Sequence, residues 1–243
     1  MSISKNQLKL IQSLSQKKYR SKHQLFMAEG VKVVNELLHS SFELVQLFAT
    51  ADFICADFQD KKTTISEADL KKVSQLKTPN EVLGLFRIPI PKPISNTGLT
   101  VVLDAINDPG NLGTIIRLCD WFGISQLVCS EDTVDCYNPK VVQASMGSLP
   151  RISIHYTNVT TYLQHSNLPI FMADMDGENV YKKTLPQEAI LILGNEANGV
   201  SDAIKQLANQ IISIPRFGEI QQTESLNVAT ATAILLSEFR RGS

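Results

Sequence analysis

In the C-terminal part of the chain, hydrophobic residues come in short continuous runs rather than in alternation with polar residues. Runs rich in Val, Ile and Leu are typical of strands that are buried on both faces, as in a parallel sheet covered by helices. Five such runs predict strands, at residues 99–105, 126–129, 169–173, 189–193 and 210–214. Helical segments are expected between and after them, at residues 111–122, 139–146, 201–207 and 225–240. The pattern predicts an α/β fold with an open parallel sheet, whose ligand lies beyond the carboxyl ends of the strands.

The N-terminal part has a mixed pattern of shorter elements. Helices are predicted at residues 7–14, 31–38 and 67–73, and strands at residues 23–28, 43–49 and 52–55. Residues 87–98, RIPIPKPISNTG, hold three prolines, which cannot continue a helix or the interior of a sheet. This stretch is typical of an extended linker. We therefore expect two domains, a small α/β domain at residues 1–94 and a larger one at residues 95–243.

The first segment with candidate chemistry is LDAINDPGNLGTIIRLCDWFG, at residues 103–123. A turn follows the strand, and Asn111 is placed to cap the next helix. Gly113 and Arg117 lie one turn apart, away from the apolar face of that helix. Gly113 has no side chain and leaves space beside Arg117, so Arg117 could bind an anion. Equally, Arg117 could be a surface residue that pairs with Asp120. The segment lacks the GxGxxG spacing of a dinucleotide-binding loop, which disfavours a nucleotide-dependent oxidoreductase.

The second segment is ILILGNEANGVS, at residues 190–201. Four apolar residues run directly into Gly194, and Gly199 follows Glu196 closely. Two glycines around a carboxylate make a tight loop that exposes backbone donors and acceptors. The alternative is a simple turn before the next helix, which Ser201 would cap.

The third segment covers residues 212–241, where a strand ends at Pro215 and a polar loop precedes an apolar helix. Ser225 and Asn227 lie where that helix begins. Ser225 could be only an N-cap. Asn227, within the first turn, can present its side chain to a ligand as well as to the backbone. The small residues of the helix allow close approach by another helix or subunit.

The composition is that of an ordinary globular protein, with 43% hydrophobic and 19% charged residues. No run of about eighteen apolar residues occurs, so we expect no membrane span. The polar, basic start lacks the apolar core of a signal peptide, so we expect a cytoplasmic protein, or one in a compartment that is reached without that signal. The four cysteines form no CxxC pair and have no His at metal-ligand spacing. Buried reduced thiols are therefore expected at Cys119 and Cys129, and no metal site.

Charge is distributed unevenly along the chain. Residues 1–95 carry 14 Lys and Arg against 9 Asp and Glu, whereas residues 96–243 carry 9 against 15. Within residues 1–35, Glu29 alone opposes seven basic residues, which are Lys5, Lys9, Lys17, Lys18, Arg20, Lys22 and Lys32. A basic arm suits a polyanion, because each neutralised phosphate releases counterions. A solvated helix face would give the same charge pattern.

Together the three segments resemble the SpoU (TrmH-like) family of RNA 2′-O-ribose methyltransferases, within the SPOUT class. The resemblance covers residues 99–242, and the N-terminal part looks like the substrate-binding domain that many members carry. The matching residues are Asn111, Gly113 and Arg117 in the first segment, Gly194, Asn195, Glu196 and Gly199 in the second, and Ile214, Pro215, Ser225, Leu226, Asn227 and Val228 in the third.

This resemblance implies S-adenosylmethionine as the cofactor, a deep C-terminal trefoil knot, and a homodimer with active sites near its interface. Arg117 would act at the ribose and the adjacent phosphate. The catalytic residues implied are Arg117, Asn111, Glu196, Ser225 and Asn227. The cofactor-binding residues implied are Ala173, Gly194, Asn195, Glu196, Gly199, Ile214, Pro215 and Leu226, and Asp174 is a further candidate because it follows Ala173 just past a strand end.

Between Gly218 and Glu224 the chain has EIQQT, which is longer than the usual spacing in the family and falls in a loop expected to border the cofactor. The implied substrate is structured RNA, and the two-domain layout favours ribosomal RNA over transfer RNA by analogy. A non-catalytic RNA-binding module is the alternative of a different class. Affinity for S-adenosylmethionine would discriminate the two, and the three polar clusters argue for the enzyme.

Overall fold

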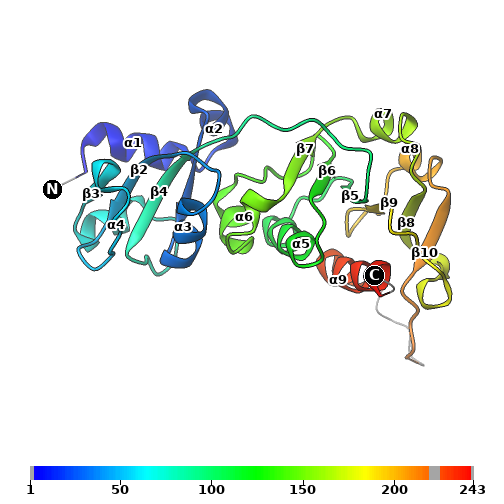
Figure 1. The fold of residues 1–243 in the computed structure, drawn as a ribbon. Helices are drawn as coiled ribbons and strands as arrows, with labels where there is room; N and C mark the ends of the chain where they lie inside the picture. The colour runs from blue at the N-terminus through cyan, green and yellow to red at the C-terminus, as the bar shows by residue number, and fades with distance from the viewer. Residues whose placement is uncertain (1–2, 219–224, 242–243) are drawn as a thin grey trace. The chain divides into compact units, whose positions relative to one another are not determined.

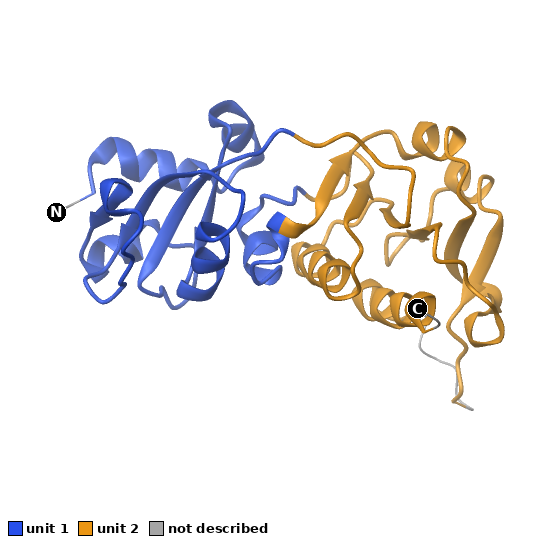
Figure 2. Cartoon of the chain, viewed as in Figure 1, with its two compact units in different colours: residues 1–90, 135–150 blue, residues 91–134, 151–243 orange. Residues whose placement is uncertain are grey.

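The computed structural model describes residues 3–218 and 225–241 (Figure 1). The chain forms two compact units (Figure 2), residues 1–90 with 135–150, and residues 91–134 with 151–243. None of the helices in the described part of the chain has the length and apolar character needed to cross a membrane.

The first unit is built on a mixed four-stranded sheet with strand order β1-β4-β2-β3. The central β4 pairs antiparallel with β1 and β2, and β3 pairs parallel with β2. Apolar side chains from α1, β1, β2, α4 and β4 form its core. The strands are β1 (Leu25–Glu29), β2 (Leu44–Ala49), β3 (Lys62–Thr64) and β4 (Val82–Arg87), and the helices are α1 (Lys5–Ser13), α2 (Lys17–His23), α3 (Val31–Leu38), α4 (Glu67–Val73) and α6 (Pro139–Ala144).

Most elements predicted in this unit are confirmed within a few residues, but the strand predicted at residues 52–55 is wrong. Phe53 is buried there, whereas Ile54 is 90% exposed. The edge of β2 pairs instead with β3, beginning with Leu47 opposite Lys62. The sequence of β3, KTT, has no hydrophobic signal. The apolar β4 and the helix α2 were not predicted either.

Arg20, counted in the basic arm, is a buried structural residue with 2% of its surface exposed. Its Nε and Nη2 donate to Asp135 Oδ2 at 2.8 and 2.5 Å. Its Nη1 donates to the carbonyls of Leu14 and Ser15 at 2.8 and 2.9 Å. These bonds tie residues 135–150 to the turn between α1 and α2, so Arg20 is not a phosphate contact.

The second unit is built on a six-stranded sheet with order β10-β8-β9-β5-β6-β7, in which all neighbours are parallel. The inner strands β5, β6 and β9 are buried along their whole length, which explains their continuous apolar sequences. The predicted α/β fold is confirmed. The strands are β5 (Leu99–Leu103), β6 (Gln126–Cys129), β7 (Ser153–Tyr156), β8 (Ile170–Asn179), β9 (Ala189–Leu193) and β10 (Gln210–Ser213), and the helices are α5 (Pro109–Trp121), α7 (Val159–Gln164), α8 (Asp202–Lys205) and α9 (Val228–Arg240).

The two long helices begin at residues other than those predicted. Asp108, not Asn111, caps α5, because its Oδ1 accepts the backbone N–H of Asn111 at 2.8 Å. Asn227, not Ser225, caps α9, because its Oδ1 accepts the N–H of Ala229 at 3.0 Å. Both corrections leave the side-chain amide nitrogens of Asn111 and Asn227 available for other contacts.

Other predictions in the second unit fare unevenly. β7 was not predicted, because its sequence SIHY mixes polar and apolar residues. The short helix α7 was not predicted either. β8 continues through a polar stretch to Asn179, because it pairs there with β10 beyond a bulge at Ile211 and Ile212. Cys119 and Cys129 are buried, as predicted, and burial raises the pKa of Cys119 to about 12. The loop expected to border the cofactor, at residues 219–223, lies outside the described residues.

Candidate functional site

The site lies where β5 and β9 end. These strands are neighbours in the sheet, and their last paired residues are Leu103 and Leu193. Since both strands run in the same direction, the segments that follow them leave the same edge of the sheet side by side. The loop to α5 carries the first sequence motif, and the loop after β9 carries the second.

Three polar side chains from the three motifs meet in a chain of hydrogen bonds. Asn227 Nδ2 donates to Asn111 Oδ1 at 2.8 Å, and Asn111 Nδ2 donates to Glu196 Oε1. The backbone N–H groups of α9 fix the direction of this chain. They occupy Asn227 Oδ1, so the amide nitrogen of Asn227 must face Asn111. The result is a donor held against the Glu196 carboxylate.

The loop after β9 is held closed by its own backbone and by Asn195. Asn195 and Gly199 exchange two backbone hydrogen bonds, of 3.0 and 2.8 Å. The Asn195 Nδ2 donates to the carbonyl of Ala105 at 2.7 Å, which joins this loop to the end of β5. Ala105 has φ 56°, a left-handed conformation that non-glycine residues rarely adopt. The loop is therefore a braced structure rather than a simple turn.

A cavity of about 630 Å³ opens between these loops, β8, β10 and α9. All eight residues that the resemblance assigns to the cofactor line it, and so does Ser225. Asn111 and Asn227 lie outside the lining and reach it through Glu196, which is part of the wall. The lining residues are Ala173, Asp174, Met175, Leu193, Gly194, Asn195, Glu196, Ala197, Gly199, Ile212, Ile214, Pro215, Arg216, Ser225, Leu226, Val228, Ala231 and Leu235.

Arg117 is not part of the cavity wall. It lies six residues after Asn111 on α5, about 9 Å further along the helix axis, and its side chain is exposed. The alternative pairing with Asp120 does not form, because Asp120 accepts the Nε of Arg151 at 2.9 Å. Within the described residues, Arg117 has no hydrogen-bond or ion-pair partner. Its guanidinium is therefore available to an anion outside the protein.

Several lining residues were not predicted. Met175 lies on the polar extension of β8, and Arg216 follows the Ile214–Pro215 step. Val228 and Leu235 lie on the face of α9 that borders the cavity. The expectation that a ligand lies beyond the carboxyl ends of the strands does not by itself indicate Met175, because the length of β8 was not known from the sequence. Val228, Ala231 and Leu235 are three or four positions apart on α9, so they share one face of the helix, and any one of them at the cavity implies the other two.

The cavity fits S-adenosylmethionine in size and chemistry. Its volume lies within the range of about 300–1,000 Å³ usual for small-ligand sites. Apolar side chains such as Ile212, Ile214 and Leu226 suit the adenine and ribose faces. The carboxylates of Asp174 and Glu196 suit a ligand that carries a sulfonium and an ammonium group.

Gly194→Ala is expected to weaken S-adenosylmethionine binding by about ten- to a hundredfold. A Cβ at this position would overlap the backbone of Gly199 and Val200. Relief of such overpacking costs about 1–3 kcal/mol and would move the loop that lines the cavity. Isothermal titration calorimetry measures the effect. The unaltered protein is the reference, and an unchanged affinity in Gly194→Ala would contradict the assignment.

Comparison with known families and proteins gives a consistent result. Residues 98–237 match the sequence model of the SpoU rRNA Methylase family, and residues 5–84 match that of the MRM3-like substrate binding domain. The chain is 30% identical over 234 residues to the 23S rRNA (guanosine(2553)-2′-O)-methyltransferase RlmP of Bacillus subtilis, with 93% of each chain covered.

Solved structures with the same fold cover the whole chain. A Porphyromonas gingivalis protein described as an RNA methyltransferase of the TrmH family is 37% identical, with a TM-score of 0.90 and 100% of both chains covered. The AdoMet-bound rRNA methyltransferase of Sinorhizobium meliloti is 28% identical, with a TM-score of 0.88, 100% of this chain and 97% of that chain covered.

Proposed function

The chain belongs to the SpoU rRNA methylase family, and from this premise we propose that it transfers the methyl group of S-adenosylmethionine to a ribose 2′-hydroxyl of ribosomal RNA. One observation carries the proposal. Side chains from three separate motifs form a single hydrogen-bonded chain, from Asn227 through Asn111 to Glu196, at the wall of a cavity of cofactor size.

The cofactor is held by the cavity wall. The loops around Gly194, Asn195, Glu196 and Gly199 and around Ile214 and Pro215 offer backbone groups, and Ala173 and Leu226 offer apolar surface. The bound cofactor supplies an electrophilic methyl group on a positively charged sulfur. The neighbouring carboxylate of Glu196 suits that charge.

The protein must also make the ribose hydroxyl reactive, because an uncharged 2′-hydroxyl is a poor nucleophile at neutral pH. We assign two tasks to two side chains. The Arg117 guanidinium, which stays protonated, binds the adjacent phosphate and stabilises the developing alkoxide. The Glu196 carboxylate accepts the proton, held in place by Asn111. Ser225 and Asn227 complete this wall of the site.

We propose the remaining features on the support of the family membership. Residues 1–94 form an RNA-binding domain and residues 95–243 the methyltransferase domain, which contains a deep trefoil knot. We propose a homodimer, and the support on the surface is Trp121 on α5, a large apolar side chain that is 83% exposed. The proposed ribosomal RNA substrate supports a cytoplasmic location. Transfer RNA remains the alternative substrate, and a protein without affinity for S-adenosylmethionine would instead be a non-catalytic RNA-binding module.

Lys18→Ala combined with Lys22→Ala is expected to weaken RNA binding and to lower the slope of log K against log salt by about 2. Both lysines are exposed on α2 in the unit that matches the substrate-binding domain. The slope counts the counterions that are released when RNA binds, and each lost phosphate contact lowers that number by about one. Fluorescence anisotropy with a ribosomal RNA fragment at several salt concentrations measures it. Lys71→Ala, an exposed lysine on α4, is the control; an unchanged slope in the double variant would place the RNA elsewhere.

A further inference from the structure

Helices α5 and α9 form a parallel pair that is pinned at both ends. Each has 13 residues, and they contact one another side by side (Figure 1). At the amino ends, Asn227 donates to Asn111 at 2.8 Å. At the carboxyl ends, Arg240 Nε donates to the Phe122 carbonyl at 2.9 Å, and its Nη2 to the Gly123 carbonyl at 3.2 Å. Like ends of the two helices therefore lie together.

This arrangement has an electrostatic cost that charged side chains offset. Each helix carries partial positive charge at its amino end and partial negative charge at its carboxyl end, so neighbouring parallel helices repel. Arg240 places a cation in the last turn of α9 and on the carbonyls of Phe122 and Gly123, directly after the end of α5. Glu196 places an anion beside Asn111, in the first turn of α5. Each charge opposes the partial charge of the helix end that it contacts.

We propose that Arg240 is a positioning residue for methyl transfer, because it fixes α5 against α9 and thereby holds Asn111 between Asn227 and Glu196. This inference rests on the proposed function of the site. Arg240 lies about 18 Å from the network, the length of the two helices, and touches none of the residues assigned to catalysis or to the cofactor. It acts on the register of α5, the same helix that carries Arg117 and Asn111.

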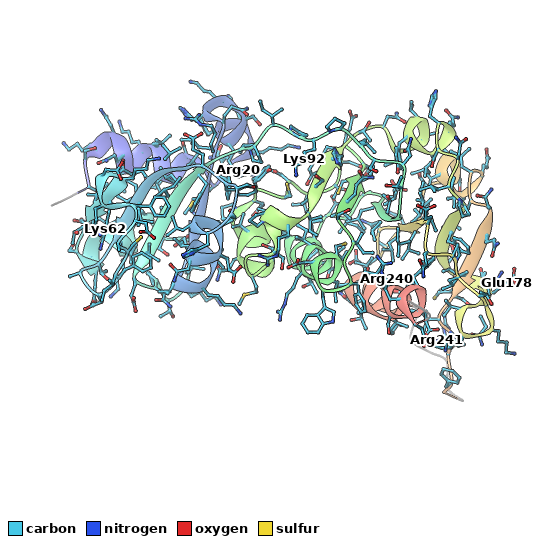
Figure 3. All side chains as sticks on the ribbon, in the orientation of Figure 1. Arg20, Lys62, Lys92, Glu178, Arg240 and Arg241 are labelled. Carbon is cyan, nitrogen blue, oxygen red and sulfur yellow. The ribbon has the colours of Figure 1, made fainter. Side chains whose placement is uncertain are left out.

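The matched control is the next residue in the chain. Arg241 pairs with Glu238 of its own helix at 3.2 Å and is exposed. Figure 3 labels both arginines near the end of α9. Removal of Arg241 takes away the same charge from the same helix end but leaves the bonds to α5 intact.

Arg240→Ala is expected to lower kcat by about 10- to 100-fold, since small misplacement of catalytic groups has effects of this size. KM for RNA should stay within about twofold, because the first unit, which matches the substrate-binding domain, is unchanged. Arg240→Lys keeps the charge but not the two-pronged contact, so its kcat should be intermediate. It also replaces Arg240→Ala if that variant fails to fold. Arg241→Ala should behave as the unaltered protein.

A double-mutant cycle separates positioning from a general loss of stability. If Arg240 acts through the network, Arg240→Ala should lower kcat less than about twofold once Asn227→Ala is present. Fully multiplicative losses, or equal effects of Arg240→Ala and Arg241→Ala, would overturn the proposal. Absence of methyl transfer by the unaltered protein would instead overturn the proposed function.

A readout that does not depend on activity is the hydrogen exchange of the Ala229 and Thr230 amides, both bonded to the Asn227 side chain. Arg240→Ala should accelerate exchange at these amides by about tenfold or more, although they lie at the far end of α9. Arg241→Ala should not. Unchanged protection in Arg240→Ala would show that the two helix ends are independent and would contradict the inference.

Discussion

Arg117→Ala is expected to lower kcat for RNA methylation by about 10²–10³-fold while the dissociation constant of S-adenosylmethionine changes by less than about twofold. The separation follows from geometry. Arg117 is exposed, outside the cavity wall, and has no partner among the residues that the structure describes. Its contribution is therefore made to the RNA and to the charge that develops on the ribose oxygen. Single-turnover methylation and calorimetry measure the two quantities.

Two further variants define what the Arg117 charge does. Arg117→Lys keeps a cation but loses the planar fork that binds a phosphate with two hydrogen bonds, so it should recover only part of the rate. Arg151→Ala is the control, because that guanidinium is engaged by Asp120 at 2.8 Å. Near-normal turnover by Arg117→Ala would remove this residue from the mechanism. A large loss of cofactor affinity would place it at the cofactor instead.

Arg20→Ala is expected to lower the free energy of unfolding of the first unit by about 3–5 kcal/mol. The substitution leaves the Asp135 carboxylate, whose side chain is 14% exposed, without its cation. It also leaves the carbonyls of Leu14 and Ser15 without their donor. Urea denaturation of the full chain, followed by circular dichroism, measures the loss.

Arg87→Ala is the matched control for this loss. Its ion pair with Glu43 spans 3.1 Å, but both side chains are at least half exposed. Surface pairs of this kind contribute at most about 1 kcal/mol. If the two variants unfold at the same urea concentration, Arg20 does not hold residues 135–150 to the rest of the first unit in solution as it does in the structure.

The fold of the second unit could be predicted because its strands are buried on both faces. The continuous apolar runs of β5, β6 and β9 have few other interpretations. Elements at the margins gave weaker signals. β7 mixes polar and apolar residues, and the second half of β8 is polar because only its pairing with β10 keeps it extended. In the first unit, the polar β3 gives no hydrophobic signal, whereas Phe53, Ile54 and Cys55 gave the signal of a strand that does not form.

The candidate site was less accessible to sequence reasoning. Each motif alone allowed a structural interpretation, as a cap, a turn or a surface arginine. Only the parallel register of Leu103 with Leu193 brings the first two motifs together, and only the path of α9 adds Asn227. The resemblance to a known family supplied what spacing could not. The role of Arg240 had no sequence signal, because its partners are backbone carbonyls about 118 positions away.

The most direct test of the account is the position of the methyl group in the product. The protein is incubated with S-adenosylmethionine that carries a deuterated methyl group and with ribosomal RNA from cells that lack its gene. The RNA is then digested to nucleosides, which are separated by liquid chromatography and identified by mass spectrometry. We expect one 2′-O-methylated nucleoside that carries the label, absent when the target ribose is replaced by its 2′-deoxy form. A label on a base, or no label in ribosomal RNA, would contradict the account.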